Sequence, residues 1–130
     1  VLLVVDDDPD VLLLVGARLR AAGYEVVTAE DGETAIASTL REQPVMVLLD
    51  LGLPKMDGFE VCRRLKADPV TCGIPIMVFS AKSQQVDKDR ASKFGADGYM
   101  AKPFDPGVLL TEIANLIGKK GDNTPWHEKS

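Results

Sequence analysis

Short, continuous apolar runs recur along this chain of 130 residues and constrain its fold more than any other feature. The clearest are residues 1–5, 45–49 and 74–79, which are rich in valine, leucine and isoleucine. They lack the alternation of a half-exposed strand, so they predict strands that are buried on both faces, as in a parallel sheet covered by helices. Shorter strands are predicted at residues 24–28 and 98–101.

Helical patterns fill the segments between these strands. Asp8 and Pro9 predict the N-cap and first position of a helix that ends at Gly23. Helical spacing places apolar side chains of the five helices at Leu12, Val15, Leu19 and Ala22; Ile36 and Leu40; Phe59, Cys62 and Leu65; Val86, Ala91 and Phe94; and Leu109, Ile113, Leu116 and Ile117. Strands that alternate with helices form right-handed βαβ units, so we predict an α/β fold with helices on both faces of a parallel sheet.

Composition excludes several other classes of protein. With 45% hydrophobic and 27% charged residues the chain can bury one core, and its net charge of −5 argues against direct contact with nucleic acid. Its apolar runs are far shorter than the roughly 18 residues that cross a bilayer, so we expect no membrane contact. Cys62 and Cys72 are expected to be free thiols in the cytoplasm. The chain begins at Val1 inside an apolar run, so we expect it to be a piece of a longer protein or to lack a few leading residues.

Chemically active side chains follow the predicted strands at their carboxyl ends. Asp6 and Asp7 follow the first strand, Asp50 the third, Ser80 the fourth and Lys102 the fifth. Ligands of open α/β sheets bind beyond these ends, near the point where the strand order reverses. If the first strand is central and the third lies beside it, the three carboxylates share one pocket.

Three carboxylates at one edge raise the pKa of at least one of them unless a cation neutralises their charge. Carboxylate oxygens select a hard cation, and Mg²⁺ is the natural candidate. Lys102 supplies a positive charge that can pair with a phosphoryl group, and Ser80 supplies a hydroxyl donor. This set suits phosphoryl transfer, which depends on positioning and charge neutralisation.

Four segments resemble the signature segments of the CheY-like receiver domains of response regulators in two-component signalling. They are residues 4–9 (VVDDDP), 48–58 (LLDLGLPKMDG), 79–81 (FSA) and 102–104 (KPF). The resemblance implies a flavodoxin-like fold, with a doubly wound five-stranded parallel sheet in the strand order 2-1-3-4-5 and five helices. We expect a receiver domain at residues 1–118 and a polar C-terminal tail or linker at 119–130.

The resemblance also implies a phosphoacceptor and a metal site. Asp50 is expected to accept a phosphoryl group from the phosphohistidine of a histidine kinase or a phosphotransfer protein. Asp7, Asp50 and the backbone carbonyl of Gly52 are expected to bind Mg²⁺ directly, and Asp6 is expected to bind it through a water. Gly52 and Lys82 occupy positions that tune the lifetime of the acyl phosphate in the family, so that lifetime stays open.

Ser80, Tyr99 and Lys102 are expected to report phosphorylation to the surface. In the family, the hydroxyl hydrogen-bonds the phosphoryl group, the lysine pairs with it, and the aromatic side chain turns inward. We expect this change to shift a pre-existing equilibrium of the segment from Ser80 to Tyr99 and so to control a partner, an output domain of the parent protein or a homodimer. A cis peptide bond is expected between Lys102 and Pro103.

Two other functions stay open. A Mg²⁺-dependent phosphohydrolase with an aspartyl-phosphate intermediate would carry a second acid two residues after its nucleophile, where this chain has Gly52. A receiver-like module that works without phosphorylation would not need the acids, the hydroxyl and the lysine together. A flavin-binding module is discarded, because residues 6–8 would repel a phosphate. The leading hypothesis is a switch that catalyses only its own phosphorylation and dephosphorylation and is not an enzyme for another substrate.

Overall fold

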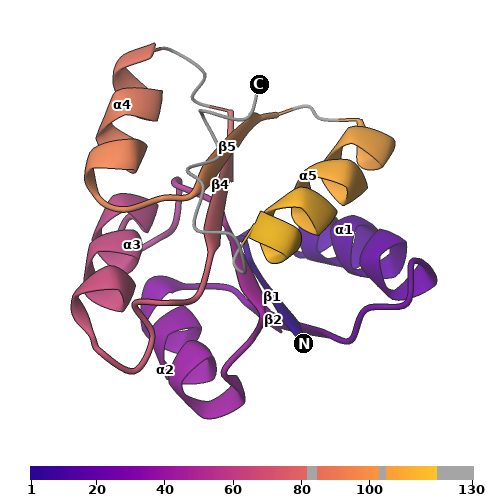
Figure 1. Ribbon diagram of the computed structural model, residues 1–130, viewed down its shortest axis with the longest axis horizontal. Helices are drawn as coiled ribbons and strands as arrows, with labels where there is room; N and C mark the ends of the chain where they lie inside the picture. Colours follow the sequence, from indigo (N-terminus) through magenta and orange to yellow (C-terminus); the bar gives the residue numbers. More distant parts are fainter. Residues whose placement is uncertain (82–84, 103–104, 120–130) are drawn as a thin grey trace.

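The computed structural model describes residues 1–81, 85–102 and 105–119, and in these ranges five strands and five helices alternate (Figure 1). The strands are β1 (Leu2–Val5), β2 (Val26–Ala29), β3 (Met46–Leu49), β4 (Ile76–Ser80) and β5 (Gly98–Ala101). The helices are α1 (Pro9–Ala21), α2 (Gly32–Glu42), α3 (Gly58–Ala67), α4 (Gln85–Lys93) and α5 (Pro106–Lys119).

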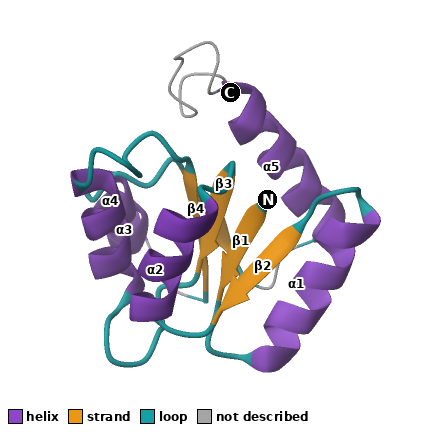
Figure 2. Cartoon of the chain, turned by 90° about the horizontal axis from the view of Figure 1, so that it is seen from below, coloured by secondary structure: helices purple, strands orange, loops and turns teal. Residues whose placement is uncertain are grey.

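All five strands are parallel and lie in the order β2-β1-β3-β4-β5. Helices α1 and α5 cover one face of the sheet, and α2, α3 and α4 cover the other (Figures 1 and 2). This confirms the predicted doubly wound α/β fold and its strand order. The order reverses between β1 and β3, which places the carboxyl ends of these two strands side by side.

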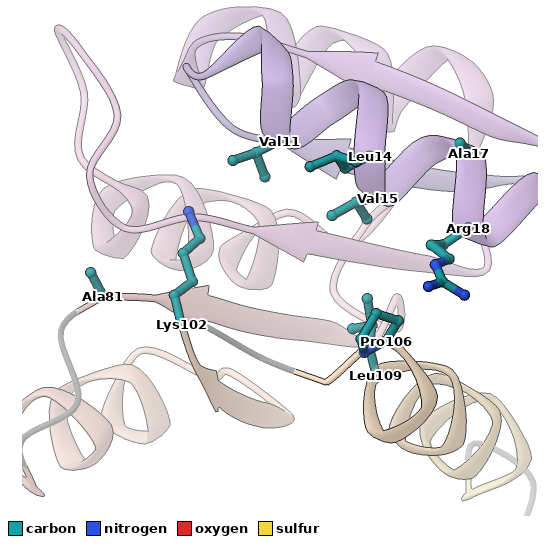
Figure 3. Close-up of a pocket in the computed structure, with 9 residues that line it drawn as sticks. All are labelled: Val11, Leu14, Val15, Ala17, Arg18, Ala81, Lys102, Pro106 and Leu109. Atoms are coloured by element: carbon teal, nitrogen blue, oxygen red, sulfur yellow. The ribbon is translucent and has the colours of Figure 1, made fainter.

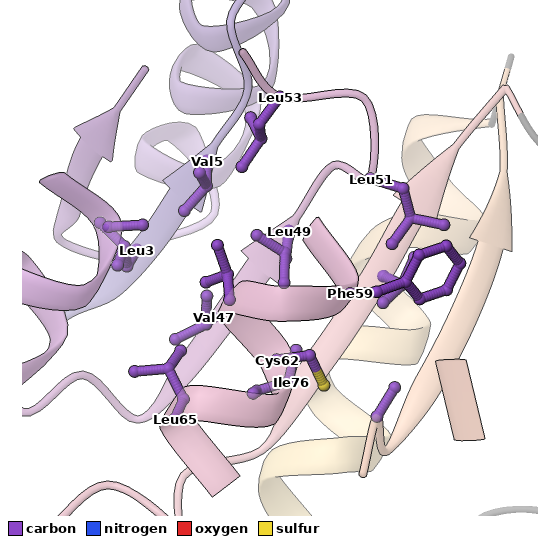
Figure 4. Close-up of a cluster of buried hydrophobic side chains, with 14 of the residues drawn as sticks. Leu3, Val5, Val47, Leu49, Leu51, Leu53, Phe59, Cys62, Leu65 and Ile76 are labelled. Carbon is purple, nitrogen blue, oxygen red and sulfur yellow. The ribbon is translucent and has the colours of Figure 1, made fainter. Parts of the chain in front are cut away.

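The continuous apolar strands supply two cores, one on each face of the sheet. In β1, Leu3 and Val5 belong to the cluster under α2, α3 and α4 (Figure 4), whereas Leu2 and Val4 belong to the cluster under α1 and α5. Each of these four side chains is at most 1% exposed. A strand buried on both faces has no position that favours a polar side chain, which explains the unbroken apolar run.

Two strands, β2 and β4, begin two residues later than the sequence predicts. The N–H of Tyr24 donates to the Leu19 carbonyl at 3.1 Å, so this residue closes α1 behind Gly23 (φ +98°), and β2 starts at Val26. Before β4, Pro75 has no N–H to donate, and the N–H of Ile74 bonds within the preceding turn. The pairing therefore starts one residue after the proline.

Some predicted apolar anchors face solvent. Leu40 is 42% exposed, Val86 is 65% exposed, and Ala22 is an exposed C-cap, so these three predictions were wrong. Helix α2 instead buries small residues, and its buried Thr39 satisfies its hydroxyl by donating to the Ala35 carbonyl at 2.7 Å. Hydrophobic spacing missed this face because a polar side chain can be buried when it finds an internal partner.

The remaining elements follow the expected boundaries closely. Asp8, Asp31 and Asp57 cap α1, α2 and α3 by accepting backbone N–H groups of the first turn. Residues 82–84, directly before α4, lie outside the described residues. The predicted tail, residues 119–130, lies almost entirely outside them too, so that boundary stays a prediction. Within the described ranges, none of the helices combines the length and apolar character that crossing a membrane requires.

Candidate functional site

The carboxyl ends of β1 and β3 bring three acidic residues together. In the parallel register Val5 pairs with Leu49, and the N–H of Asp50 donates to the Val5 carbonyl at 2.9 Å. Asp6 and Asp50 therefore leave adjacent strands at the same level. One carboxylate oxygen from each of Asp6, Asp7 and Asp50 lies within 4.8 Å of the others. The structure confirms that the sheet gathers these carboxylates in one pocket.

The three acids differ sharply in burial. Asp6 is 1% exposed and Asp50 is 7% exposed, whereas Asp7 is exposed to solvent. A buried carboxylate loses its water, so it needs hydrogen bonds or a cation. Asp6 accepts the N–H of Asp8 on Oδ1 at 2.9 Å. Its other oxygen, Oδ2, accepts from the Lys102 ammonium at 2.7 Å.

Lys102 places its ammonium between the two buried carboxylates. Its Nζ lies 2.7 Å from Asp6 Oδ2 and 3.6 Å from Asp50 Oδ1. The same nitrogen lies 4.7 Å from the centre of the Phe79 ring, a cation–π distance. The lysine was predicted to belong to this site, but its contact with Phe79 was not. The only signal for that contact is an aromatic residue directly before Ser80.

The electrostatics of the pocket act most clearly on Asp50. Burial raises the pKa of this carboxyl above its ordinary value, and the negative charges of Asp6 and, more weakly, Asp7 raise it further. The Lys102 ammonium and a hydrogen bond from the Gly52 N–H act in the opposite direction. The net effect is a higher pKa, and the burial of the carboxyl contributes most to it.

The loop after Asp50 is shaped by two glycines. The N–H of Gly58 donates to the Leu51 carbonyl at 3.0 Å, and a Cβ on this glycine would overlap the Asp50 carbonyl oxygen. Any other residue at this position would push the loop away from α3. At Gly52 a Cβ would lie 3.7 Å from Asp50 Oδ2, an ordinary contact. The chain therefore leaves this side of the Asp50 carboxylate uncovered.

Lys55, in the same loop, has a left-handed backbone with φ +68°. This conformation is costly for a residue with a side chain.

Ser80 and Tyr99 meet at the ends of β4 and β5. Ser80 is 3% exposed, and its carbonyl accepts the N–H of Lys102 at 2.8 Å. Tyr99 is half-buried against the core under α3 and α4. Burial and the negative charge of Asp87 raise the pKa of the Tyr99 hydroxyl, and its hydrogen bond with Ser80 opposes them. The structure thus brings together the two residues that the sequence paired as a switch.

Two parts of the sequence prediction lie outside the described residues. These are the cis peptide bond expected at Pro103 and the side chain of Lys82, which was expected to tune the lifetime of the modified group. The other expected site residues all lie at the carboxyl edge of the sheet.

An apolar pocket of about 680 Å³ opens beside the site, between α1 and α5 (Figure 3). Lys102 and Ala81 line the end nearest the acids, and Arg18 lines the other end. Its walls include Val11, Leu14, Val15 and Leu109. Hydrophobic spacing did not find this pocket, because Leu14 lies between two core positions of α1 and is 69% exposed.

The acidic cluster fits a hard divalent cation. It offers only carboxylate oxygens, which suit Mg²⁺ rather than a softer metal. Asp7 is open to solvent, so a bound ion could keep several of its waters. The negative charges of Asp6 and Asp7, which help to raise the pKa of Asp50, are charges that such an ion would offset.

Comparisons with known proteins point to one family. The family model of the response regulator receiver domain matches residues 2–114. The chain is 41% identical over 128 residues to the DNA-binding dual master transcriptional regulator RpaA of Synechocystis, covering 98% of this chain and 53% of that protein. It is 42% identical over 127 residues to the alkaline phosphatase synthesis transcriptional regulatory protein PhoP of Bacillus subtilis, covering 98% and 52%. The chain thus spans about half the length of these relatives.

Solved structures agree with this result. The receiver domain of the sensor histidine kinase PA1611 from Pseudomonas aeruginosa is 32% identical, with a TM-score of 0.84 and coverage of 90% of this chain and 96% of that one. That structure is described with a magnesium ion coordinated in its active site cleft. A CheY-like receiver domain protein from Methanospirillum hungatei has a TM-score of 0.88 at 26% identity, covering 95% and 97%.

Proposed function

The chain belongs to the response regulator receiver domain family, whose members are phosphorylation-activated switches of two-component systems, and we propose that Asp50 is its phosphoacceptor. One observation carries this proposal. Asp50 is a buried carboxylate at the end of a central strand, with Asp6 and Asp7 within 4.8 Å and the Lys102 ammonium 3.6 Å away. A phosphoryl acceptor needs positive charge beside it, because the incoming group adds negative charge to a site that is already acidic. Lys102 supplies one positive charge, and the acids can hold a cation that supplies more.

The proposed donor is the phosphohistidine of a histidine kinase or a phosphotransfer protein. A carboxylate oxygen of Asp50 attacks the phosphorus, the new O–P bond forms as the P–N bond breaks, and the imidazole nitrogen leaves with the bonding electrons and takes up a proton. Water later cleaves the acyl phosphate and returns the carboxylate and inorganic phosphate. Lys102 offsets the charge of the transferred group, and Ser80 hydrogen-bonds it. The chain itself acts on no other substrate in this proposal.

Mg²⁺ is the proposed cofactor. Asp7, Asp50 and the carbonyl of Gly52 would hold it directly, and Asp6 would hold it through a water. When bound, the ion supplies positive charge that neutralises the oxygens of the acceptor and of the transferred phosphoryl group. The exposure of Asp7 and the all-oxygen donor set support this assignment. So does the magnesium described in the receiver domain of PA1611.

The proposed output runs through Ser80 and Tyr99. Their hydrogen bond links the strand end beside the acceptor to a side chain that is half-buried at the surface. When the Ser80 hydroxyl turns to the phosphoryl group, Tyr99 loses this partner and repacks. The segment from Ser80 to Tyr99 then presents a changed surface to a partner, to an output domain or to a second copy of the chain.

An output domain in the parent protein is part of the proposal, because the chain spans about half of RpaA and PhoP. The DNA-binding activity in the name of RpaA would belong to such a domain rather than to this acidic chain. We also propose a cytoplasmic location, which is supported by the two free cysteines, Cys62 and Cys72.

The test is phosphorylation by a small donor. The chain is incubated with Mg²⁺ and acetyl phosphate, and its intact mass is followed. We expect a gain of one phosphoryl group that requires Mg²⁺ and that Asp50→Asn abolishes. Asp8→Asn is the matched control, because it removes a nearby carboxylate and keeps a side chain that can cap α1. Equal phosphorylation of Asp50→Asn and the unmodified chain would refute Asp50 as the acceptor.

A further inference from the structure

Helix α4 is held to the rest of the domain by few apolar contacts. Among its side chains that the structure describes, Ala91 is buried at 1% exposure, whereas Val86 is 65% exposed. A helix with one small buried residue gains little from the hydrophobic effect, so another interaction must fix its position.

Arg90 provides that interaction. Its guanidinium carbon lies 4.1 Å from the centre of the Phe59 ring and 5.7 Å from the centre of the Phe94 ring. The two rings are themselves 6.0 Å apart and inclined at 51°. A planar guanidinium can stack on an aromatic face while its edges stay hydrated, which a lysine ammonium cannot do. Arg90 therefore covers an aromatic pair that joins α4 and the turn after it to the start of α3.

Phe59 connects this stack to the loop that contains the proposed acceptor. It is 3% exposed and belongs to the core cluster that also contains Leu51 (Figure 4). Its neighbour Gly58 packs directly on the Asp50 carbonyl and donates to the Leu51 carbonyl. Phe59 directly follows Gly58 in the chain, so these contacts tie the ring on which Arg90 lies to the loop after Asp50.

We propose that Arg90 is a positioning residue that couples α4 to the loop after Asp50 through its stack on Phe59. The coupling rests on the proposed function, since it requires that phosphorylation of Asp50 shifts the loop that follows it. It is distinct from the Ser80–Tyr99 hydrogen bond, because it runs through α3 and not through the ends of β4 and β5. The proposed coupling is thus a second route between the acceptor and α4.

Hydrogen exchange of α4 tests the stack in the unmodified protein. We expect Arg90→Ala to speed exchange of the α4 amides about fivefold, which corresponds to about 1 kcal/mol at 25 °C. Arg90→Lys keeps the charge but not the plane, so its exchange should lie closer to Arg90→Ala than to the parent. Lys88→Ala is the control, because it removes a charge from an exposed position of the same helix. Equal exchange in all four proteins would overturn the stack.

A double-mutant cycle identifies the ring. Phe59→Leu keeps an apolar side chain in the core but removes the aromatic face. In that background Arg90→Ala should speed α4 exchange by much less than fivefold. An undiminished effect would show that Arg90 acts through other contacts and would overturn the proposal.

Beryllofluoride with Mg²⁺ tests the coupling. In the parent protein this phosphoryl mimic should change α4 exchange, and in Arg90→Ala the change should be smaller. The same change in both proteins would overturn the coupling. Acetyl phosphate labelling distinguishes the two proposals: labelled Asp50 with no α4 response in the parent refutes only the coupling, whereas a chain that takes no label refutes the proposed acceptor.

Discussion

Replacing Lys102 with methionine removes the positive charge of the acidic pocket and keeps a side chain of similar length. The lost contacts are 2.7 Å to Asp6 Oδ2 and 3.6 Å to Asp50 Oδ1. At an effective dielectric constant of about 20, the shorter contact alone is worth about 6 kcal/mol before desolvation is subtracted. Breaking a buried ion pair on one side costs about 3–5 kcal/mol. The lysine side chain is 22% exposed, which places our estimate at the lower end, about 3 kcal/mol.

Chemical denaturation of the metal-free protein measures this cost. Lys102→Met should lower the free energy of unfolding by about 3 kcal/mol and the melting temperature by about 10 °C. Added Mg²⁺ should stabilise Lys102→Met more than it stabilises the parent, because the ion replaces the missing charge and no longer competes with the ammonium for Asp6. Calorimetric titration should accordingly show tighter Mg²⁺ binding by the variant.

The exposed Lys88 supplies the control for this experiment. Lys88→Met makes the same change of charge at an exposed position of α4 and should change the stability by less than about 0.5 kcal/mol. The reasoning would be refuted if Lys102→Met cost no more than this control, as a solvent-exposed ion pair would. It would also be refuted if Mg²⁺ stabilised the parent and Lys102→Met equally.

Four further predictions follow from the geometry. Gly58→Ala should cost about 2 kcal/mol in urea denaturation, because its Cβ overlaps the Asp50 carbonyl, and an unchanged midpoint would contradict this. Lys55→Gly should stabilise the chain by about 1 kcal/mol in the same assay by relieving the positive φ, and a loss of stability would count against that strain. Asp50→Asn should stabilise the metal-free protein near neutral pH. The pKa of Asp50 is raised in the folded state, so the cost of its charge is present above that pKa and disappears as the pH falls toward the ordinary value of 3.8. The free energies of unfolding of Asp50→Asn and the parent should therefore converge as the pH is lowered. A difference that stays constant with pH would argue against the raised pKa. Tyr99→Ala should leave phosphorylation by acetyl phosphate intact and weaken phosphorylation-dependent binding to the partner, and unweakened binding would exclude Tyr99 from the switch.

The strands and the acidic site could be predicted because both depend on local sequence. A run such as residues 1–5 has no polar position, so only a strand with two covered faces accommodates it. Residues that directly follow such strands must lie at the sheet edge. The prediction for Asp6 and Asp50 therefore needed only the strand order, which the family resemblance supplied.

The contacts that tune the site could not be predicted in the same way. Lys102 was expected to pair with a phosphoryl group. In this structure its shortest ion pair is with Asp6, 96 residues earlier in the chain. Arg90 shows the same limit, because a guanidinium over an aromatic ring leaves no periodic pattern in the sequence. Long polar side chains reach partners that depend on tertiary packing, whereas hydrophobic spacing reports only the face of one helix or strand.

The central claim is that Asp6, Asp7 and Asp50 form one cation site in which Asp50 keeps an oxygen for the phosphoryl group. A crystal structure of the chain with Mg²⁺ and beryllofluoride tests it most directly. We predict one magnesium ion in contact with Asp7 and Asp50, and beryllium bonded to a carboxylate oxygen of Asp50 with Lys102 beside its fluorides. Beryllium bonded to another residue, or magnesium bound away from these three acids, would contradict the account.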